Sequence, residues 1–190
     1  MGGLKLTLEI DPSDGTPEQI EVLFKNVGRP LTRVFRLFEG DMRQEVHKTF
    51  DAEGQLKKWK KSKRASDSGG KTLRKSGQLY RSINYRATDD ELIIGSADKR
   101  AALHFFGGTV RPKKAKSLAI PWDESVKLSP RDYEDTFIAK GVIFQTQGDK
   151  IVPLFSLRKK VVIPARRFIE YTPRARRKLF DRIITHYTEN

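Results

Sequence analysis

The chain has 190 residues, of which 38 are Lys or Arg and 24 are Asp or Glu, so its formal net charge is +14. It has no Cys, which excludes disulfides, thiolate catalysis and cysteine-based metal sites. No apolar run approaches the ~18 residues of a membrane span, and the first residues lack the apolar stretch of a signal peptide. We therefore expect one basic domain, residues 1–190, made in a reducing cytoplasm and with no membrane partner.

The positive charge is concentrated in two segments. Residues 54–81 hold ten basic residues and one acidic residue, and residues 158–182 hold ten basic and two acidic residues. Such segments favour phosphate backbones or acidic protein surfaces. The alternative is a solvated face that only keeps the protein soluble. We favour binding for the two segments together, because self-repulsion on this scale destabilises a fold.

A strand and a long helix are predicted in the first third of the chain. Apolar and polar residues alternate over residues 4–10, which indicates a strand, and residues 11–15 break it. From Pro30, which suits a first helical position, apolar residues recur at spacings of three and four until Gly54 ends the run. We expect this stripe to be core rather than a cofactor site. It comprises Leu31, Val34, Phe35, Phe38, Met42, Val46 and Phe50.

Residues 55–78 are polar, basic and rich in Ser and Gly, which predicts a long loop. Because the loop has few apolar anchors, we expect it to be mobile in the free monomer and ordered in an assembled particle. Leu73 and Leu79 are expected to be buried on either side of a turn at Gly77.

Part of this loop, from Ala65 to Thr72, nearly fits the phosphate-loop pattern, with Ala in place of the first Gly. That motif needs a buried strand before it and a helix after it, since amides at the start of the helix bind the phosphate. The residues before it are cationic, and no apolar strand ending in Asp follows. A nucleotide-binding enzyme is therefore the weaker alternative to a flexible basic loop.

Short elements follow the loop. Residues 83–87 and 92–94 predict a hairpin, and Asp98 is expected to cap a short helix that ends at Gly107. Residues 109–160 are predicted to be rich in strands, and Pro153 is expected to make one of them an edge strand. A further strand is predicted at residues 161–163.

A final helix is predicted from Thr172–Pro173. Three arginines occupy its first turn, where the helix dipole disfavours cations by about 0.3–1 kcal/mol each. We infer that an acidic partner or DNA compensates them. Its expected apolar face comprises Leu179, Phe180, Ile183, Ile184 and Tyr187.

The sequence contains no recognisable catalytic or metal-binding pattern. His47, His104 and His186 have no second His or Glu at a metal-ligand spacing, and His104 is expected to be a hydrogen-bonded structural residue. The carboxylates at residues 123–124 and 132–135 are interpreted as surface charge. We therefore predict no enzyme, with no catalytic residue, no cofactor and no bound metal.

Five features occur in a distinctive order along the chain. They are the helix at 30–50, Trp59 after a basic linker, the phrase at 73–79, a short helix ending in Gly107-Gly108, and the phrase Ile163-Pro164-Ala165-Arg166-Arg167-Phe168. In this order they resemble the phage virion morphogenesis family, the tail completion proteins of Mu-like and related tailed phages. The stretch from residue 118 through residues 129–132 and on to residues 153–155 looks like the insertion of the Mu-like branch, and the resemblance covers about residues 28–172.

The resemblance implies a structural protein of the virion neck or tail, assembled in the cytoplasm of the bacterial host. Such proteins close the tail tube or join it to the head as a homo-oligomeric ring, commonly of six copies, around the DNA channel. The implied partners are further copies of the chain, other neck, tail-tube and head-connector proteins, and packaged DNA.

We therefore expect an α+β fold, in which a long N-terminal helix and a C-terminal helix pack a small antiparallel sheet, with a β-rich insertion at 109–160. The favoured function is tail completion and head–tail joining, as a tail terminator or neck ring. The alternative is a sequence-independent nucleic-acid-binding module. The residues expected to face a partner or DNA are Lys57, Lys58, Lys60, Lys61, Lys63, Arg64, Arg174, Arg176 and Arg177.

Overall fold

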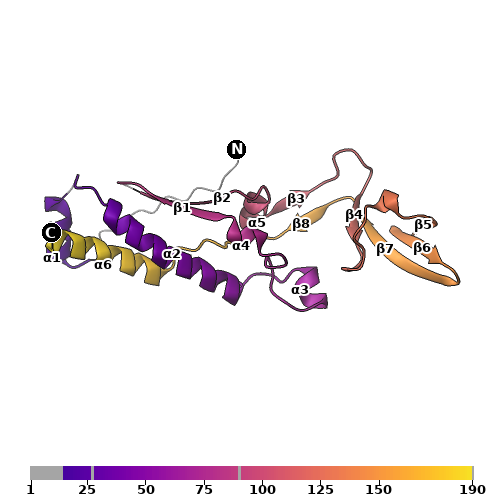
Figure 1. Cartoon of the computed structure of the whole chain (residues 1–190), viewed down its shortest axis with the longest axis horizontal. Helices are drawn as coiled ribbons and strands as arrows, with labels where there is room; N and C mark the ends of the chain where they lie inside the picture. The colour runs from indigo at the N-terminus through magenta and orange to yellow at the C-terminus, as the bar shows by residue number, and fades with distance from the viewer. Residues whose placement is uncertain (1–14, 27, 90, 190) are drawn as a thin grey trace.

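The chain forms an elongated molecule with a helical body at one end and a β-sheet arm at the other (Figure 1). This computed structural model describes residues 15–26, 28–89 and 91–189. The strand predicted at residues 4–10 lies outside the described residues. The α+β class is confirmed, because the described chain combines helices with small antiparallel sheets.

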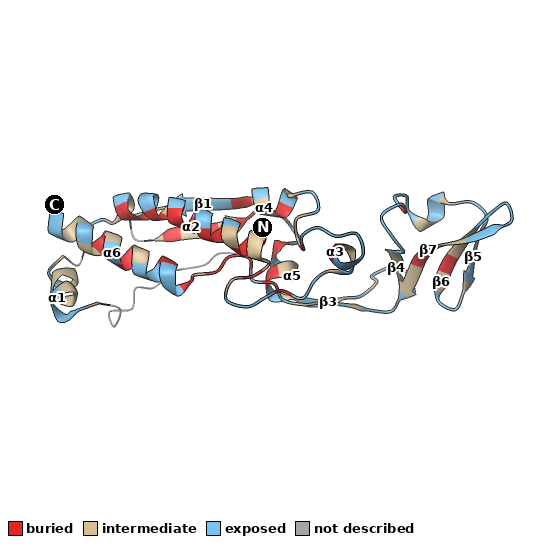
Figure 2. Ribbon diagram, turned by 90° about the horizontal axis from the view of Figure 1, so that it is seen from below, coloured by how far each residue is buried: buried red, intermediate tan, exposed pale blue. Residues whose placement is uncertain are grey.

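The body is built around two amphipathic helices, α2 (Thr32–Ala52) and α6 (Pro173–Glu189), as predicted. They run antiparallel, since Asp41 contacts Lys178 whereas Glu45, one turn later in α2, contacts Thr172 just before α6. Figure 2 shows the buried residues of α2 and α6 facing the interior of the body. The apolar stripe of α2 is thus core, as predicted.

The start of the chain differs from the prediction in two respects. α2 begins at Thr32 rather than at Pro30, and Leu31 is the residue that caps it; the Leu31 amide, which has no acceptor within the helix, donates to the carbonyl of Asp89. A helix that was not predicted, α1 (Pro17–Lys25), precedes it. The side chains of Thr16 and Gln19 form a capping box around its first turn.

The predicted hairpin is confirmed and lies against α2. It consists of β1 (Ile83–Ala87) and β2 (Leu92–Ser96), and α4 (Gln78–Arg81) leads into it. Gly77 has φ +69°, a conformation that favours glycine, so the predicted turn is present. Leu79 is 5% exposed and belongs to the core, whereas Leu73 is only half-buried against it.

The junction with the arm begins at α5 (Ala101–Phe106), which ends at Gly107 as predicted. Asp98 accepts a hydrogen bond from the amide of Arg100, the residue before the helix, so it stabilises the preceding turn and does not cap α5 itself. β3 (Gly108–Val110) then pairs antiparallel with β8 (Val161–Ile163).

The arm carries an antiparallel sheet in the strand order β4-β7-β6-β5, which confirms the β-rich character expected of residues 109–160. Val126, Ile143, Leu154 and Phe155 form a second hydrophobic cluster there. The elements of the arm are β4 (Leu118–Pro121), η2 (Pro130–Asp132), β5 (Thr136–Ala139), β6 (Val142–Gln147) and β7 (Lys150–Arg158).

The prediction that Pro153 lies in an edge strand is wrong, because β7 pairs with both β4 and β6. The register shifts beside Pro153, so that Leu154 is an extra residue on β7. β4 pairs with β7 only from Phe155 onward. Proline has no backbone N–H to donate. Because Pro153 lies outside the part of β7 that pairs with β4, no hydrogen bond between these two strands is lost.

Residues 55–78 are irregular except for two short helices, α3 (Lys63–Asp67) and the start of α4. The buried residues of this segment are Trp59, Ala65 and Thr72, of which only the first two are apolar, in line with the expectation of few apolar anchors. The Trp59 ring packs edge-to-face on Phe50, with ring centres 5.6 Å apart. These contacts tie the segment to the body within one chain, and its mobility in the free monomer stays a prediction.

Candidate interaction surfaces

The features that carry the family resemblance meet at the junction between body and arm. Gly107 has φ +74°, and a methyl group there would lie 2.7 Å from the backbone nitrogen of Ala165. Phe168 is fully buried, with its ring centre 5.7 Å from that of Phe50 and 5.4 Å from that of Phe105. These residues therefore hold the fold together where the arm leaves the body.

Arg166 of the same phrase holds the basic loop. Its side chain is 5% exposed and donates two hydrogen bonds to the Lys60 carbonyl, at 3.1 and 3.0 Å. Burial lowers the pKa of Arg166 from its usual value, while Glu53 acts in the opposite direction. Trp59 Nε1 also donates to the Arg167 carbonyl at 3.3 Å. The loop and the late phrase are therefore parts of one structural unit.

The six loop cations that were expected to face a partner divide into two groups. In the first, Lys58 donates to the Ala52 carbonyl at 2.7 Å, and Arg64 donates to the Lys71 carbonyl at 2.6 Å. Lys63 belongs to the same group, since its ammonium lies 5.3 Å from the ring centre of Trp122. The side chains of the second group are exposed and form no hydrogen bond with the described residues; they are Lys57, Lys60 and Lys61.

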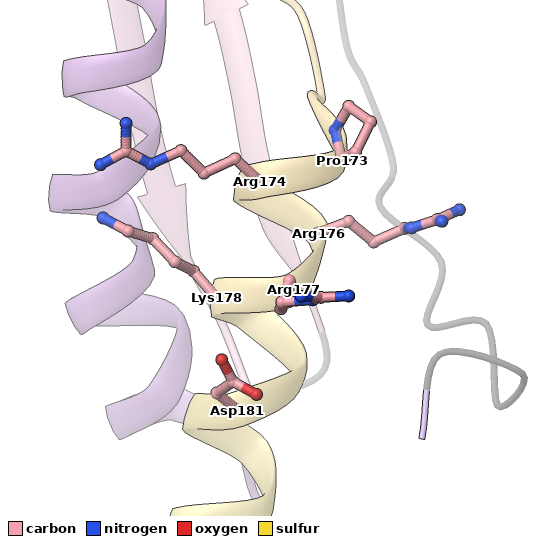
Figure 3. Close-up of a pocket in the computed structure, with 6 residues that line it drawn as sticks. All are labelled: Pro173, Arg174, Arg176, Arg177, Lys178 and Asp181. Carbon is pink, nitrogen blue, oxygen red and sulfur yellow. The ribbon is translucent and has the colours of Figure 1, made fainter. Parts of the chain in front are cut away.

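The three arginines expected at the start of α6 are exposed there. Together with Pro173, Lys178 and Asp181 they line an open pocket of about 450 Å³. Figure 3 shows Arg174 beside Lys178 on the side of α2, whereas Arg176 and Arg177 point the other way. The pocket therefore does not focus all three guanidinium groups on one point, and it suits an extended charged surface better than a single small anion.

Two cations farther along α6 are neutralised inside the chain. Lys178 and Arg182 each donate a hydrogen bond to the carboxylate of Asp41, at 2.7 Å. Burial alone would raise the pKa of Asp41, but these hydrogen bonds outweigh it and the pKa lies below its usual value. The acidic charge of α2 thus binds the middle of α6 and leaves the arginines of its first turn at the surface.

The phosphate-loop-like segment has the wrong neighbours for a nucleotide site. Helix α3 precedes its two glycines instead of following them. Lys71 forms an ion pair with Asp51 at 2.8 Å, and the buried Thr72 accepts a hydrogen bond from the Ser62 amide. The Lys and Thr that would bind phosphate and magnesium in that motif instead hold the loop to the body.

The histidines and carboxylates are the other side chains that could form a metal site. Within residues 15–26, 28–89 and 91–189, no group of three or more His, Asp or Glu side chains is placed to hold a metal ion. His104 Nδ1 is buried without a hydrogen-bond partner among these residues, so the predicted hydrogen bond is missing at this nitrogen. Burial lowers the pKa of His104. No helix in the described part of the chain is long and apolar enough to cross a membrane.

One apolar surface of the arm was not predicted as a site. Phe137, Phe144 and Pro153 lie in register across three strands, and the two Phe rings stack with centres 5.5 Å apart. Phe137 is 40% exposed and Ile151 is 62% exposed. The residues of this surface, which we call the arm face, are exposed or half-buried; they are Leu118, Ile120, Phe137, Ala139, Val142, Phe144, Ile151 and Pro153.

The arm face is unusual for an antiparallel sheet. Such a sheet normally presents apolar side chains to the core and polar side chains to water. In the arm, Ile143 and Phe155 point to the cluster on one face, while the neighbouring Phe144 and Pro153 lie on the other. A contiguous exposed apolar surface of this kind is typical of an interaction site. The sequence signal for this surface was the presence of apolar residues at successive positions of the strands, where an alternation of apolar and polar residues would be usual.

The comparison with known families agrees with the resemblance that the sequence motifs indicated. The model of the phage virion morphogenesis family matches residues 18–188. No curated protein and no solved structure matches the chain. The match extends from α1 through the arm to the last turns of α6, and so covers both the body and the arm face. The chain therefore belongs to the phage virion morphogenesis family and has a role in building the phage particle.

Proposed function

We propose that this protein completes the tail and joins it to the head, as a homo-oligomeric ring of six copies around the DNA channel of the virion neck. In this proposal the chain is one tail-completion domain, residues 1–190, whose insertion at 109–160 supplies the arm. It assembles in the host cytoplasm and acts without catalysis. The observation that carries the proposal is the arm face, an apolar surface held away from the body.

A closed ring needs two different contact surfaces on every subunit, because each copy contacts its two neighbours through unlike faces. The elongated shape provides surfaces at well-separated places (Figure 1). The arm face is apolar, whereas the start of α6 and the exposed lysines Lys57, Lys60 and Lys61 are cationic. We assign the arm face to a neighbouring copy and the cationic surfaces to other neck, tail-tube or head-connector proteins, or to packaged DNA.

The second candidate is a sequence-independent nucleic-acid-binding module. The exposed side chains of Lys57, Lys60 and Lys61 favour it, since exposed lysine ammonium groups suit phosphate oxygens. The two candidates differ in what the arm face does. A module that only binds nucleic acid needs no apolar surface, whereas a ring subunit does.

A double substitution on the arm face tests the proposal. Phe137→Glu with Ile151→Glu places two charges on this face, and Ile138→Glu is the control on the same strand, where Ile138 is 67% exposed but points to the opposite face. Oligomeric state is measured by light scattering, and incorporation is measured by imaging the protein mixed with tail tubes.

We expect the double variant to melt like the wild type, to remain monomeric and to be left out of particles. The control should assemble. If the double variant assembles as well as the control does, the arm face is not a contact surface and the proposal fails. If the wild-type chain is monomeric even with tail tubes and binds duplex DNA, the second candidate replaces it.

A further inference from the structure

A second cationic surface lies where the arm joins the body. Two segments connect the β3–β8 pair with the arm sheet, residues 111–117 on one side and residues 158–160 on the other. We call them together the basic strap. Figures 1 and 2 show them as the narrow connection between the two ends of the molecule. They begin and end at paired residues, since Val110 pairs with Val161 and Leu118 pairs with Arg158.

The basic strap has an extreme composition. Seven of its residues are cationic and none is acidic. The seven side chains are exposed, and no carboxylate of the described chain forms an ion pair or a hydrogen bond with them. They are Arg111, Lys113, Lys114, Lys116, Arg158, Lys159 and Lys160.

The net charge of successive sequence segments does not reveal this surface. Residues 111–116 fall in a stretch whose cations are nearly balanced by acidic residues, such as those at 123–124 and 132–135. The fold places those carboxylates in the arm and leaves the cations in the connection. Pairing of β3 with β8 and of β4 with β7 then brings both ends of residues 111–117 to the ends of residues 158–160. The positive charge is thus assembled by the topology.

The chemistry of the basic strap indicates its partner. Like charges within about 8 Å repel at physiological ionic strength, so a cluster of seven calls for a compensating polyanion. Five of the seven are Lys, which is depleted in protein–protein interfaces but common in contacts to phosphate. The two segments contain no aromatic residue on which an unpaired base could stack.

We propose that the basic strap binds the phosphate backbone of double-stranded DNA without reading its sequence. The proposal deepens the assembly function and rests on it for the source of the DNA, which is the molecule in the neck channel. Phosphate contacts by exposed lysines give affinity and position but carry no sequence information. An acidic protein surface is the competing partner, and the experiment below decides between them.

The test measures binding of the purified full-length chain to two labelled duplexes of unrelated sequence over a series of salt concentrations. The test variant is Lys113→Gln with Lys114→Gln and Lys116→Gln. The matched control is Lys127→Gln with Lys140→Gln and Lys150→Gln, which removes the same charge from exposed positions elsewhere in the arm. Melting curves check that both variants are folded, and light scattering checks their oligomeric state.

We expect the wild type to bind both duplexes equally. Each lost phosphate contact lowers the slope of log K against log salt by about 0.9, so the strap variant should lose about 3 from the slope and at least about tenfold in affinity. The control should keep the slope. Equal losses in both variants would show that only net charge matters, and would overturn the proposal.

A parallel titration with polyglutamate separates the two partners. Binding of polyglutamate that depends on the strap, without binding of duplex DNA, would overturn the proposal in favour of an acidic protein. The strap variant is also tested for ring formation, which depends on the arm face in the proposed function. A strap variant that still assembles but no longer binds DNA supports both proposals; a wild type that assembles without binding DNA overturns the strap proposal alone.

Discussion

The ammonium of Lys63 lies 5.3 Å from the ring centre of Trp122, so a cation of helix α3 contacts the arm just beyond β4. A second contact between the same regions is the ion pair of Lys75 with Glu124, at 3.0 Å. The arm is therefore attached to the body by side chains of the basic loop as well as by the two chain segments of the basic strap. Lys63, which was expected to face a partner, therefore forms a contact within the chain instead.

Removing this contact should loosen the arm. A cation–π contact at an exposed site contributes about 0.5–1 kcal/mol, so Lys63→Ala should raise the hydrogen exchange of the Trp122 amide, which donates to the Leu154 carbonyl, without lowering global stability much. Lys60→Ala is the control, because the Lys60 side chain is exposed and only its carbonyl is used. Unchanged exchange in the Lys63 variant would mean that the basic strap and the Lys75–Glu124 ion pair position the arm without Lys63.

Arg166 should be far more sensitive than its neighbour Arg167. Arg166→Lys cannot reproduce the two hydrogen bonds that one guanidinium donates to the single oxygen of the Lys60 carbonyl, and the site is buried. We expect a loss of about 1–3 kcal/mol in the free energy of unfolding, measured by urea denaturation. Arg167→Lys, at an exposed side chain, should cost less than about 0.5 kcal/mol. Equal costs would contradict a structural role for Arg166.

Leu79 tests the placement of the hairpin and α4 against α2. Leu79→Ala removes a side chain that is 5% exposed in the core, and should cost about 2–5 kcal/mol in the free energy of unfolding. The control is Leu56→Ala, since Leu56 is 60% exposed. Chemical denaturation of both variants measures the difference. A cost for Leu79 that is no larger than that for Leu56 would mean that the hairpin does not pack as described.

Regular periodicity predicted the principal helices because packing and local pattern agree there. The stripe from Leu31 to Phe50 and the apolar face of α6 both contribute to the core. Each could be predicted from the local spacing of its apolar residues, without knowing which distant residues it contacts. α1 was missed although its start carries a capping box, since a nine-residue helix has only a short apolar pattern. Pro153 was assigned to an edge because a register shift depends on the partner strand.

The sites were harder to predict, because they depend on contacts between distant segments. Nothing near Lys60 in the sequence shows that its carbonyl accepts hydrogen bonds from Arg166. The same holds for Glu170, whose buried carboxylate accepts hydrogen bonds from the amides of Gln55 and Leu56, at 3.0 Å each. The sequence therefore predicted correctly that many of the cations are exposed. It did not show which of them form contacts within the chain.

Asp41 should make stability depend on acid pH. Its pKa is lowered in the folded chain, so its contribution is fully present above the unfolded pKa of about 3.9 and is lost as pH falls through the folded value. The difference in unfolding free energy between the wild type and Asp41→Asn should be about 1–3 kcal/mol near neutral pH and should shrink below about pH 4. Asp67→Asn, at an exposed side chain, is the control and should show no such dependence. A difference that is constant with pH would contradict the role of the charged pair.

The last prediction concerns the arginines in the first turn of α6. Replacing Arg174, Arg176 and Arg177 with Glu should leave the chain folded, because anions are favourable near the start of a helix and the core residues of α6 are untouched. The Asp41 contacts to Lys178 and Arg182 also remain. Since a partner of opposite charge would now be repelled, incorporation into the neck or tail should be abolished.

Melting temperature and incorporation are measured on the same variant. A control with Arg36→Glu, Lys99→Glu and Lys127→Glu changes the net charge equally at exposed positions elsewhere, and should assemble normally. If the α6 variant assembles as well as this control, the arginines are only a solvated face. If it cannot fold, they serve the body's own structure instead, although all three side chains are exposed. Loss of incorporation with an unchanged melting temperature therefore identifies the start of α6 as a contact surface, distinct from the apolar arm face.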